Sequence, residues 1–199
     1  APGDAVQLST AYRPGSSGPS FPAIFPALSI SLAKQHHMEL GISMFGDNHH
    51  GTDGKPGSVG RRLRELIEEV KLMDELGLDF FGIGEHHRPD YAVSVPEILL
   101  AAAATVTKNI KLGSAVNVLS SSDPVRIYQS FAMIDQLTNG RAELVAGRGS
   151  FIESFPLYGY KLEDYDELFD EKLHLLHQIN TENPINWKGK HRAALRDQE

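Results

Sequence analysis

Residues 59–84, VGRRLRELIEEVKLMDELGLDFFGIG, predict a helix that leads directly into a strand. Ser58 stands before the stretch as a residue type that caps helix N-termini. Gly77 stands where a helix commonly ends in the left-handed conformation. The six residues at 79–84 then form a short apolar run that is typical of a buried parallel strand. Within the helical part, apolar side chains recur at helical spacing: Val59, Leu63, Leu66, Ile67, Val70, Met73 and Leu76.

The same alternation of strand and helix continues along the chain. We expect strands at 40–45, 79–84, 110–119 and 141–146. We expect helices at 59–76, 95–106, 124–137 and 165–180. Asp123 and Pro124 suit the start of the third helix, and Asn139-Gly140 suits its end. Four such units, each roughly 30–40 residues long, imply parallel strands joined by right-handed crossovers.

Two α/β architectures fit this pattern, an open doubly wound sheet and a closed (β/α)₈ TIM barrel. The first strand is followed by a long polar loop at 46–57 rather than by a compact glycine-rich dinucleotide turn. Polar segments follow several strands, which favours the barrel. The chain then contains about the first four of the eight β/α units of such a barrel. A half-barrel leaves two open sheet edges, so we expect further sequence or a partner to cover them. The polar loop at 47–51 either covers a pocket or stands in solvent.

The first 37 residues differ from the rest of the chain. They contain five of the eleven prolines and almost no charge, and they match a secretory leader poorly. We expect residues 1–37 to be a poorly ordered leader or artificial extension outside the fold, and residues 38–199 to be the domain. The alternative is an extension packed on the surface.

Composition excludes several classes of partner. A net charge of −7 argues against nucleic-acid binding, which needs a basic face. No apolar run approaches the roughly 20 residues of a membrane helix. The chain has no cysteine, which excludes disulfides and thiolate metal sites and fits a reducing compartment such as the cytoplasm.

Glu85-His86-His87 follows the second expected strand and has three interpretations. A histidine beside a carboxylate can act as a general base near neutral pH. The histidines can equally be structural, hydrogen-bonded groups. A metal site is the weakest interpretation, because successive side chains of an extended segment point to opposite faces. We therefore expect no metal.

Two further segments lie in the second half of the third expected strand and just after the fourth. Arg148 lies between Gly147 and Gly149, where it can fork onto a phosphate or pair with a nearby carboxylate. The small residues at 113–117 either leave room for a flat ligand or simply pack closely.

Motifs in order along the chain resemble the bacterial luciferase family of flavin-dependent monooxygenases. Glu85-His-His-Arg88 is followed by Lys111-Leu-Gly-Ser-Ala-Val-Asn-Val-Leu119, Asp123-Pro-Val-Arg126, Leu137-Thr-Asn-Gly-Arg141 and Ala146-Gly-Arg-Gly149. Each motif alone is weak, but all of them together, in order and at the right spacing, are specific, and the likeness covers roughly residues 39–180.

The resemblance implies an enzyme that uses reduced flavin mononucleotide (FMN) and oxygen to oxygenate a small organic substrate. It places the catalytic base on His86 and the flavin phosphate on Arg148. It implies further cofactor contacts at Glu85, Gly147, Gly149 and residues 115–117, with a cis peptide between Ala115 and Val116. It also implies a separate flavin reductase as a partner and a homodimer formed through the helices at 95–106 and 124–137.

The sequence departs from the family at two positions. The reactive cysteine of luciferases is Gly147 here, and a following tyrosine is Phe151, so light emission is not implied. The alternative functions are a non-catalytic flavin-binding protein or partner subunit and, less favoured, a metal-dependent hydrolase on the same fold. Within the first class, a deazaflavin is the alternative cofactor to FMN.

Overall fold

The computed structural model describes residues 6–9, 38–48, 51, 54–55 and 57–199. The central sheet contains six strands: β1 (Val6–Ser9), β2 (Gly41–Met44), β3 (Phe80–Ile83), β4 (Lys111–Ser114), β5 (Asn117–Val118) and β6 (Ala142–Gly147). The helical elements are α1 (Val59–Glu75), α2 (Pro96–Ala104), α3 (Pro124–Thr138), α4 (Ser154–Leu157), η1 (Leu162–Asp164) and α5 (Tyr165–Thr181). A hairpin of β7 (Ile185–Trp187) and β8 (Leu195–Gln198) follows.

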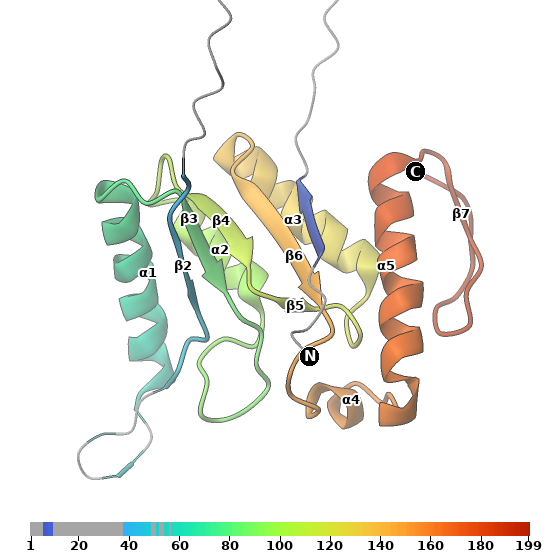
Figure 1. Ribbon diagram of the computed structural model, residues 1–199, viewed down its shortest axis with the longest axis horizontal. Helices are drawn as coiled ribbons and strands as arrows, with labels where there is room; N and C mark the ends of the chain where they lie inside the picture. The colour runs from blue at the N-terminus through green and yellow to red at the C-terminus, as the bar shows by residue number, and fades with distance from the viewer. Residues whose placement is uncertain (1–5, 10–37, 49–50, 52–53, 56) are drawn as a thin grey trace, which may run out of the picture.

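The sheet has the order β1-β6-β4-β3-β2, and β5 also pairs with β6 (Figure 1). Every pairing among β2, β3, β4, β5 and β6 is parallel, which confirms the expected β/α units. β1 pairs antiparallel with β6 along the edge that faces away from β4. This pairing differs from the expectation that residues 1–37 lie outside the fold, and the rest of that segment lies outside the described residues.

Helix ends follow the predicted capping chemistry. Ser58 Oγ accepts a hydrogen bond from the Arg61 amide at 3.4 Å, and Asp123 Oδ1 accepts one from the Val125 amide at 2.9 Å. Gly77 and Asn139 end α1 and α3 in the left-handed region, with φ values of 77° and 55°. These caps fix the residues at which each helix begins and ends.

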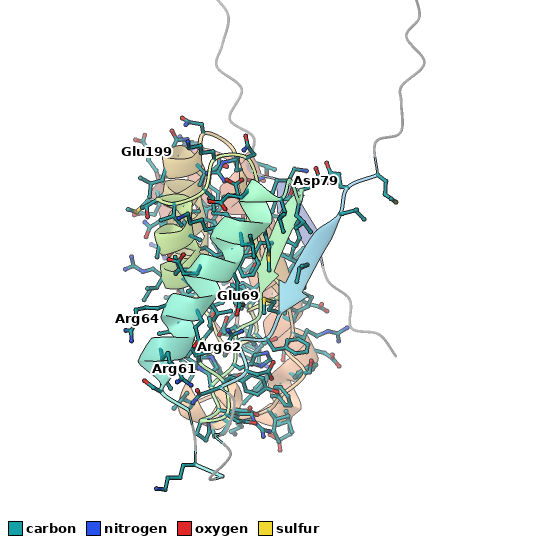
Figure 2. The ribbon with its side chains drawn as sticks, turned by 90° about the vertical axis from the view of Figure 1, so that its left-hand side faces the viewer. Arg61, Arg62, Arg64, Glu69, Asp79 and Glu199 are labelled. Atoms are coloured by element: carbon teal, nitrogen blue, oxygen red, sulfur yellow. The ribbon has the colours of Figure 1, made fainter. Side chains whose placement is uncertain are left out.

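The helices α1, α2, α3 and α5 lie on one side of the sheet, where they bury the core (Figures 1 and 2). Fully buried side chains of both layers meet there, including Leu66, Phe81, Leu100, Leu112, Phe131 and Leu176. No described helix covers the opposite face of the sheet. That inner face borders an open hollow of about 530 Å³ lined by Glu39, Gly41, Ser43, Phe80, Ala115, Val116, Glu143 and Val145.

The Phe80 ring lies on the inner face beside three glycines. Gly41 is on β2, Gly82 is on β3 together with Phe80, and Gly113 is on β4. A Cβ atom at Gly82 would lie 2.9 Å from the Phe80 ring, and one at Gly113 would lie 2.7 Å from it. A Cβ atom at Gly41 would lie 2.7 Å from the Phe80 carbonyl oxygen. The absence of side chains at these positions is therefore what allows one aromatic ring to lie across the sheet.

The outer helices expose several large apolar side chains. Ile98 on α2 is 70% exposed, and Met133 and Leu137 on α3 are 68% and 61% exposed. The expected homodimer contact through α2 and α3 stays a prediction, which a monomeric sedimentation coefficient would contradict. None of the described helices is both long enough and apolar enough to span a lipid bilayer.

We expect Gly113→Ala to lower the free energy of unfolding by about 1–3 kcal/mol, because an added methyl group overpacks a close contact. The new Cβ would meet Phe80 and, at 2.8 Å, the backbone oxygen of Glu143, which cannot move aside cheaply. Urea denaturation measures the change. Gly60→Ala in the first turn of α1 is the matched control, because only the tip of Arg64 lies near it, at 3.6 Å. Equal destabilisation by both variants would contradict the packing argument.

Candidate active site

The loops that follow β2 and β3 form one backbone-paired unit at the C-terminal edge of the sheet. Between the two loops, the Ala92 amide donates to the Gly46 carbonyl and the Asn48 amide donates to the Asp90 carbonyl, each at 2.8 Å; within the loop after β3, the His86 amide donates to the Val93 carbonyl at 2.9 Å. Backbone groups at a loop surface are ordinarily satisfied by water, so these bonds fix the loops to each other. His86 is consequently held on a rigid segment.

The imidazole of His86 lies in an aromatic cage. It stacks on Tyr91 with ring centroids 4.2 Å apart, and it meets Phe45 and Phe151 edge-on at 5.3 Å each. Both ring nitrogens are buried, and neither has a hydrogen-bond partner among the described residues. Buried polar groups normally have a partner, so both nitrogens of His86 are available to a bound molecule.

Burial lowers the pKa of His86, and the charge of His87 acts in the same direction. The carboxylates of Asp47, Glu153 and Glu85 oppose this shift without reversing it. The imidazole is therefore neutral at pH 7, the state in which it can accept a proton.

His87 points away from the cage that holds His86. Its Nε2 lies 2.8 Å from Glu85 Oε1, and its ring meets Tyr158 edge-on at 5.3 Å. The two adjacent imidazoles thus diverge, as alternating side chains of an extended segment must. They do not form a shared metal site.

Arg62 is a site-supporting residue that the sequence analysis missed. From the buried face of α1, its Nε donates to the Asp47 carbonyl at 3.1 Å, and its Nη1 contacts Glu69 Oε1 at 2.6 Å (Figure 2). It therefore ties the loop after β2 to α1. A signal existed, because position 62 lies one turn before Leu66 on the apolar stripe of the helix, where a charged residue is unusual. Asn48 is buried in the same loop, and His49 and His50 lie outside the described residues.

The peptide between Ala115 and Val116 is cis, as the family resemblance predicted. The expected strand at 110–119 is divided there into β4 and β5. A Cβ atom at Gly147 would lie 2.5 Å from Val116 Cγ2, so glycine at 147 makes room for valine at 116. Ala115 and Val116 border the inner hollow, whereas Asn117 is 1% exposed.

Arg148 forms an ion pair with a nearby carboxylate, one of the two interpretations of this position. Its Nη1 lies 2.5 Å from Asp166 Oδ1, and its guanidinium lies over the ring of Phe169. Gly149 takes a positive φ of 81°, and its carbonyl accepts a hydrogen bond from the Tyr165 hydroxyl at 2.8 Å. Gly149 also lines a narrow pocket of about 20 Å³ together with His86. The structure thus gathers His86 and the 147–149 segment at the same edge of the sheet.

Lys172 is a buried cation that the sequence did not reveal. Only 2% of the residue is exposed, and its Nζ donates to the Ser120 carbonyl at 2.7 Å while lying 4.1 Å from the centroid of the Tyr160 ring. Burial lowers the pKa of Lys172 to about 8, although Asp123 and Glu171 oppose the shift. It fixes the loop after β5 to α5.

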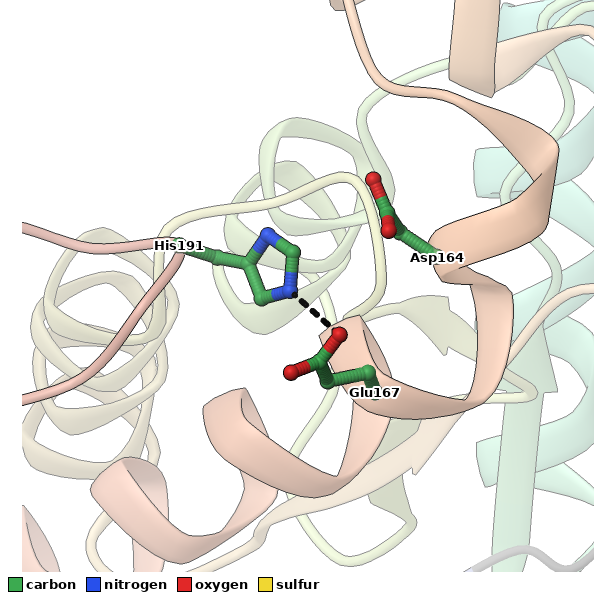
Figure 3. Close-up of side chains that lie close together, drawn as sticks. All are labelled: Asp164, Glu167 and His191. Carbon is green, nitrogen blue, oxygen red and sulfur yellow. Dashed lines mark ion pairs between the residues drawn. The ribbon is translucent and has the colours of Figure 1, made fainter.

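Asp164, Glu167 and His191 bring three potential ligand atoms within 4.8 Å of one another (Figure 3). Glu167 Oε2 already lies 2.6 Å from the Lys190 ammonium and 3.3 Å from His191 Nε2. A cation at the same oxygen competes with any metal. We interpret this cluster as an ion-pair network that joins the β7–β8 hairpin to α5.

Comparison with known proteins agrees with this geometry. The sequence profile of the luciferase-like monooxygenase family matches residues 38–199. The chain belongs to this family. Its solved neighbours have the same fold: a monooxygenase from Streptomyces bottropensis, with a TM-score of 0.72 and 24% identity, aligns over 81% of this chain and 48% of its own.

Family members with assigned activities show the same partial coverage. The 4-hydroxyprotoasukamycin monooxygenase of Streptomyces nodosus subsp. asukaensis is 30% identical over 68% of this chain and 38% of its own length. The limonene 1,2-monooxygenase of Rhodococcus erythropolis is 32% identical over 59% of this chain and 30% of its own. This chain therefore spans less than half the length of these relatives, and the structure is a partial barrel.

The buried ammonium of Lys172 predicts a pH dependence of stability. The folded pKa of about 8 lies below the ordinary value of 10.5, so the unfolded chain binds more protons between these values. Stability contributed by this group therefore rises with pH through that window, by up to about 3 kcal/mol. Urea unfolding at pH 7.5 and pH 10 measures the rise. The rise in stability should disappear in Lys172→Met and remain in Lys188→Met, which changes an exposed lysine. An equal dependence of stability on pH in both variants would contradict the role given to Lys172.

Proposed function

We propose that this chain forms the N-terminal half of a flavin-dependent monooxygenase barrel that uses reduced FMN and oxygen to oxygenate a small organic substrate. The observation that carries the proposal is His86, a neutral imidazole whose two nitrogens are buried and have no partner among the described residues. It lies at the C-terminal edge of a parallel β/α sheet, where barrel enzymes place their catalytic groups.

The inner face of the sheet fits a flat ring. Ala115 and Val116 border the open hollow of about 530 Å³, and His86 lines a separate, narrow pocket of about 20 Å³. Small side chains at this border let a ring system approach the backbone closely. Ala115, Val116 and the glycines at 147 and 149 would hold the flavin, and Arg148 would take its phosphate.

His86 would act on protons beside the ring. The flavin, when bound, supplies the transfer of electrons to oxygen that no side chain of this chain can perform. The neutral imidazole accepts a proton, and its aromatic cage excludes water around it. A separate reductase would provide the reduced flavin.

The relatives support a flavin-type cofactor but include two kinds. The oxygenating constituent of 3,6-diketocamphane monooxygenase from Pseudomonas putida, a fold neighbour at a TM-score of 0.70 and 24% identity, is solved in complex with FMN. An F420-dependent glucose-6-phosphate dehydrogenase of Amycolatopsis mediterranei is 28% identical over 63% of this chain. We propose FMN because the Glu85-His86-His87 motif resembles the flavin enzymes.

A second candidate is a flavin-binding protein or partner subunit without turnover. The specific observation in its favour is the ion pair between Arg148 and Asp166, which occupies the proposed phosphate ligand. Binding of FMN without oxygen uptake in the presence of a flavin reductase would support it.

We expect His86→Ala to bind FMN as tightly as the wild-type chain but to lose most oxygen-dependent turnover, because the proton acceptor is gone. Because burial lowers the pKa of His86, turnover should persist to more acidic pH than an ordinary imidazole allows. Flavin fluorescence titration and oxygen uptake measure the two properties. His174→Ala, on the exposed side of α5, is the control. Unchanged turnover in His86→Ala would remove His86 from the reaction.

Variants of the two partners in the Arg148–Asp166 ion pair should change FMN affinity in opposite directions. If Arg148 binds the flavin phosphate, Arg148→Ala should weaken FMN binding by about 1.5–3 kcal/mol, the scale of a charged hydrogen bond. Asp166→Asn should strengthen it, because the competing carboxylate charge is removed. Riboflavin, which lacks the phosphate, should show neither change. If both variants only lower the melting temperature, Arg148 is a structural tie between β6 and α5.

A further inference from the structure

Glu97 is a partly buried carboxyl group to which the proposed chemistry gives no part. It lies in the first turn of α2, on the helix side of the sheet, and its Oε1 accepts a hydrogen bond from Asn117 Nδ2 at 3.1 Å. Asn117 is 1% exposed, and its other side-chain atom, Oδ1, has no partner among the described residues. The bond to Glu97 is therefore the contact that fixes the Asn117 carboxamide.

Glu85 holds the residues on both sides of Asn117. Its backbone amide donates to the Val116 carbonyl at 3.2 Å, and its carboxylate Oε2 accepts from the Val118 amide at 2.8 Å. Three successive residues, 116 to 118, are thus each held by one of two glutamates. This segment begins at the cis peptide that borders the inner hollow.

The carboxyl groups of Glu85 and Glu97 differ in whether a basic side chain lies beside them. Glu85 has His87 at 2.8 Å, whereas in the described part of the chain no basic side chain forms an ion pair with Glu97. Burial raises the pKa of Glu97; its own backbone amide opposes the shift, and the charge of Glu85 adds to it. A neutral carboxyl group still accepts a hydrogen bond through its carbonyl oxygen, so the Asn117 contact does not require a charge.

Glu97 reaches the segment from the side opposite the hollow. It lines a separate cleft of about 370 Å³ together with Glu85, Tyr158 and Tyr160, whereas the hollow is bordered by Ala115 and Val116. Glu97 thus lies where it can fix the backbone beneath a bound ring without touching the ring.

We propose that Glu97, acting through Asn117 and together with Glu85, is a positioning residue that sets the course of residues 115–118 at the barrel mouth. Its effect on flavin binding rests on the proposed function. Its effect on the backbone of residues 115–118 does not depend on the proposed function.

Amide hydrogen exchange of the full chain tests the hold without any cofactor. Glu97→Ala should speed exchange within residues 115–118 by about 3- to 10-fold, the scale of one lost hydrogen bond. Glu97→Gln keeps a neutral acceptor of the same shape and should restore wild-type exchange. Asn117→Ala should reproduce the effect of Glu97→Ala, and the double variant should add nothing. Glu68→Ala, on the exposed face of α1, is the matched control.

Exchange at 115–118 that is unchanged in Glu97→Ala, unrestored in Glu97→Gln, or additive in the double variant would overturn the proposal. Titration with FMN then tests the link to function: Glu97→Ala should weaken binding about 3- to 10-fold, and Glu97→Gln should not. A wild-type chain that binds no FMN would overturn the proposed function, and the exchange experiment would still decide the role of Glu97.

Discussion

The buried carboxylate of Glu85 is the constraint on which the barrel mouth depends. Only 7% of the residue is exposed, and a carboxylate taken out of water is costly unless it is bonded. Its oxygens contact His87 Nε2 and the Val118 amide, each at 2.8 Å. Because side chains alternate along an extended segment, drawing His87 towards Glu85 turns His86 the other way. One residue thus sets both the course of β5 and the direction of the unpaired imidazole.

Glycine placement makes this arrangement sterically feasible. Gly147 leaves space for Val116 beside the cis peptide, and Gly82 and Gly113 leave space for the Phe80 ring on the inner face. Interiors are packed so closely that a single added methyl group is felt. The shape of the inner face therefore depends on glycines, which have no side chain. The polar contacts that fix residues 115–118 come from the helix side of the sheet. Strain on one layer would be transmitted to the other through residues 115–118.

The strands and helices could be predicted because their signals are local. Ser58, Asp123 and Asn139 cap helices through groups no more than a few residues away, and the structure confirms all three. Lys172 could not be predicted, because its partner Ser120 lies 52 positions earlier and a lysine on a helix normally faces water. For Arg148 the sequence gave both interpretations, since it does not say which carboxylate the fold brings near.

The cis peptide shows a different kind of limit. Composition and periodicity predict one strand at 110–119, and only the family resemblance predicted the cis peptide at Ala115–Val116, where the structure divides this strand. Glu97 was passed over for a related reason: an acidic residue in the first turn of a helix is ordinary, because it complements the helix dipole. Its burial and its contact with Asn117 arise from the packing of α2 beside β5, which no local pattern encodes.

The two faces of the sheet contribute differently to the proposed reaction. The helix face is closed, and it holds four ionisable side chains that shape the mouth: Arg62, Glu85, Glu97 and Lys172. The inner face is open, and Gly41 and Ser43 of β2 border it together with Phe80 of β3. A ring bound over Ala115 and Val116 would receive its floor and its base from this chain, since His86 and the cis peptide both come from its rigid part. Its opposite side would be covered by other atoms, and those atoms, rather than His86, would select the substrate.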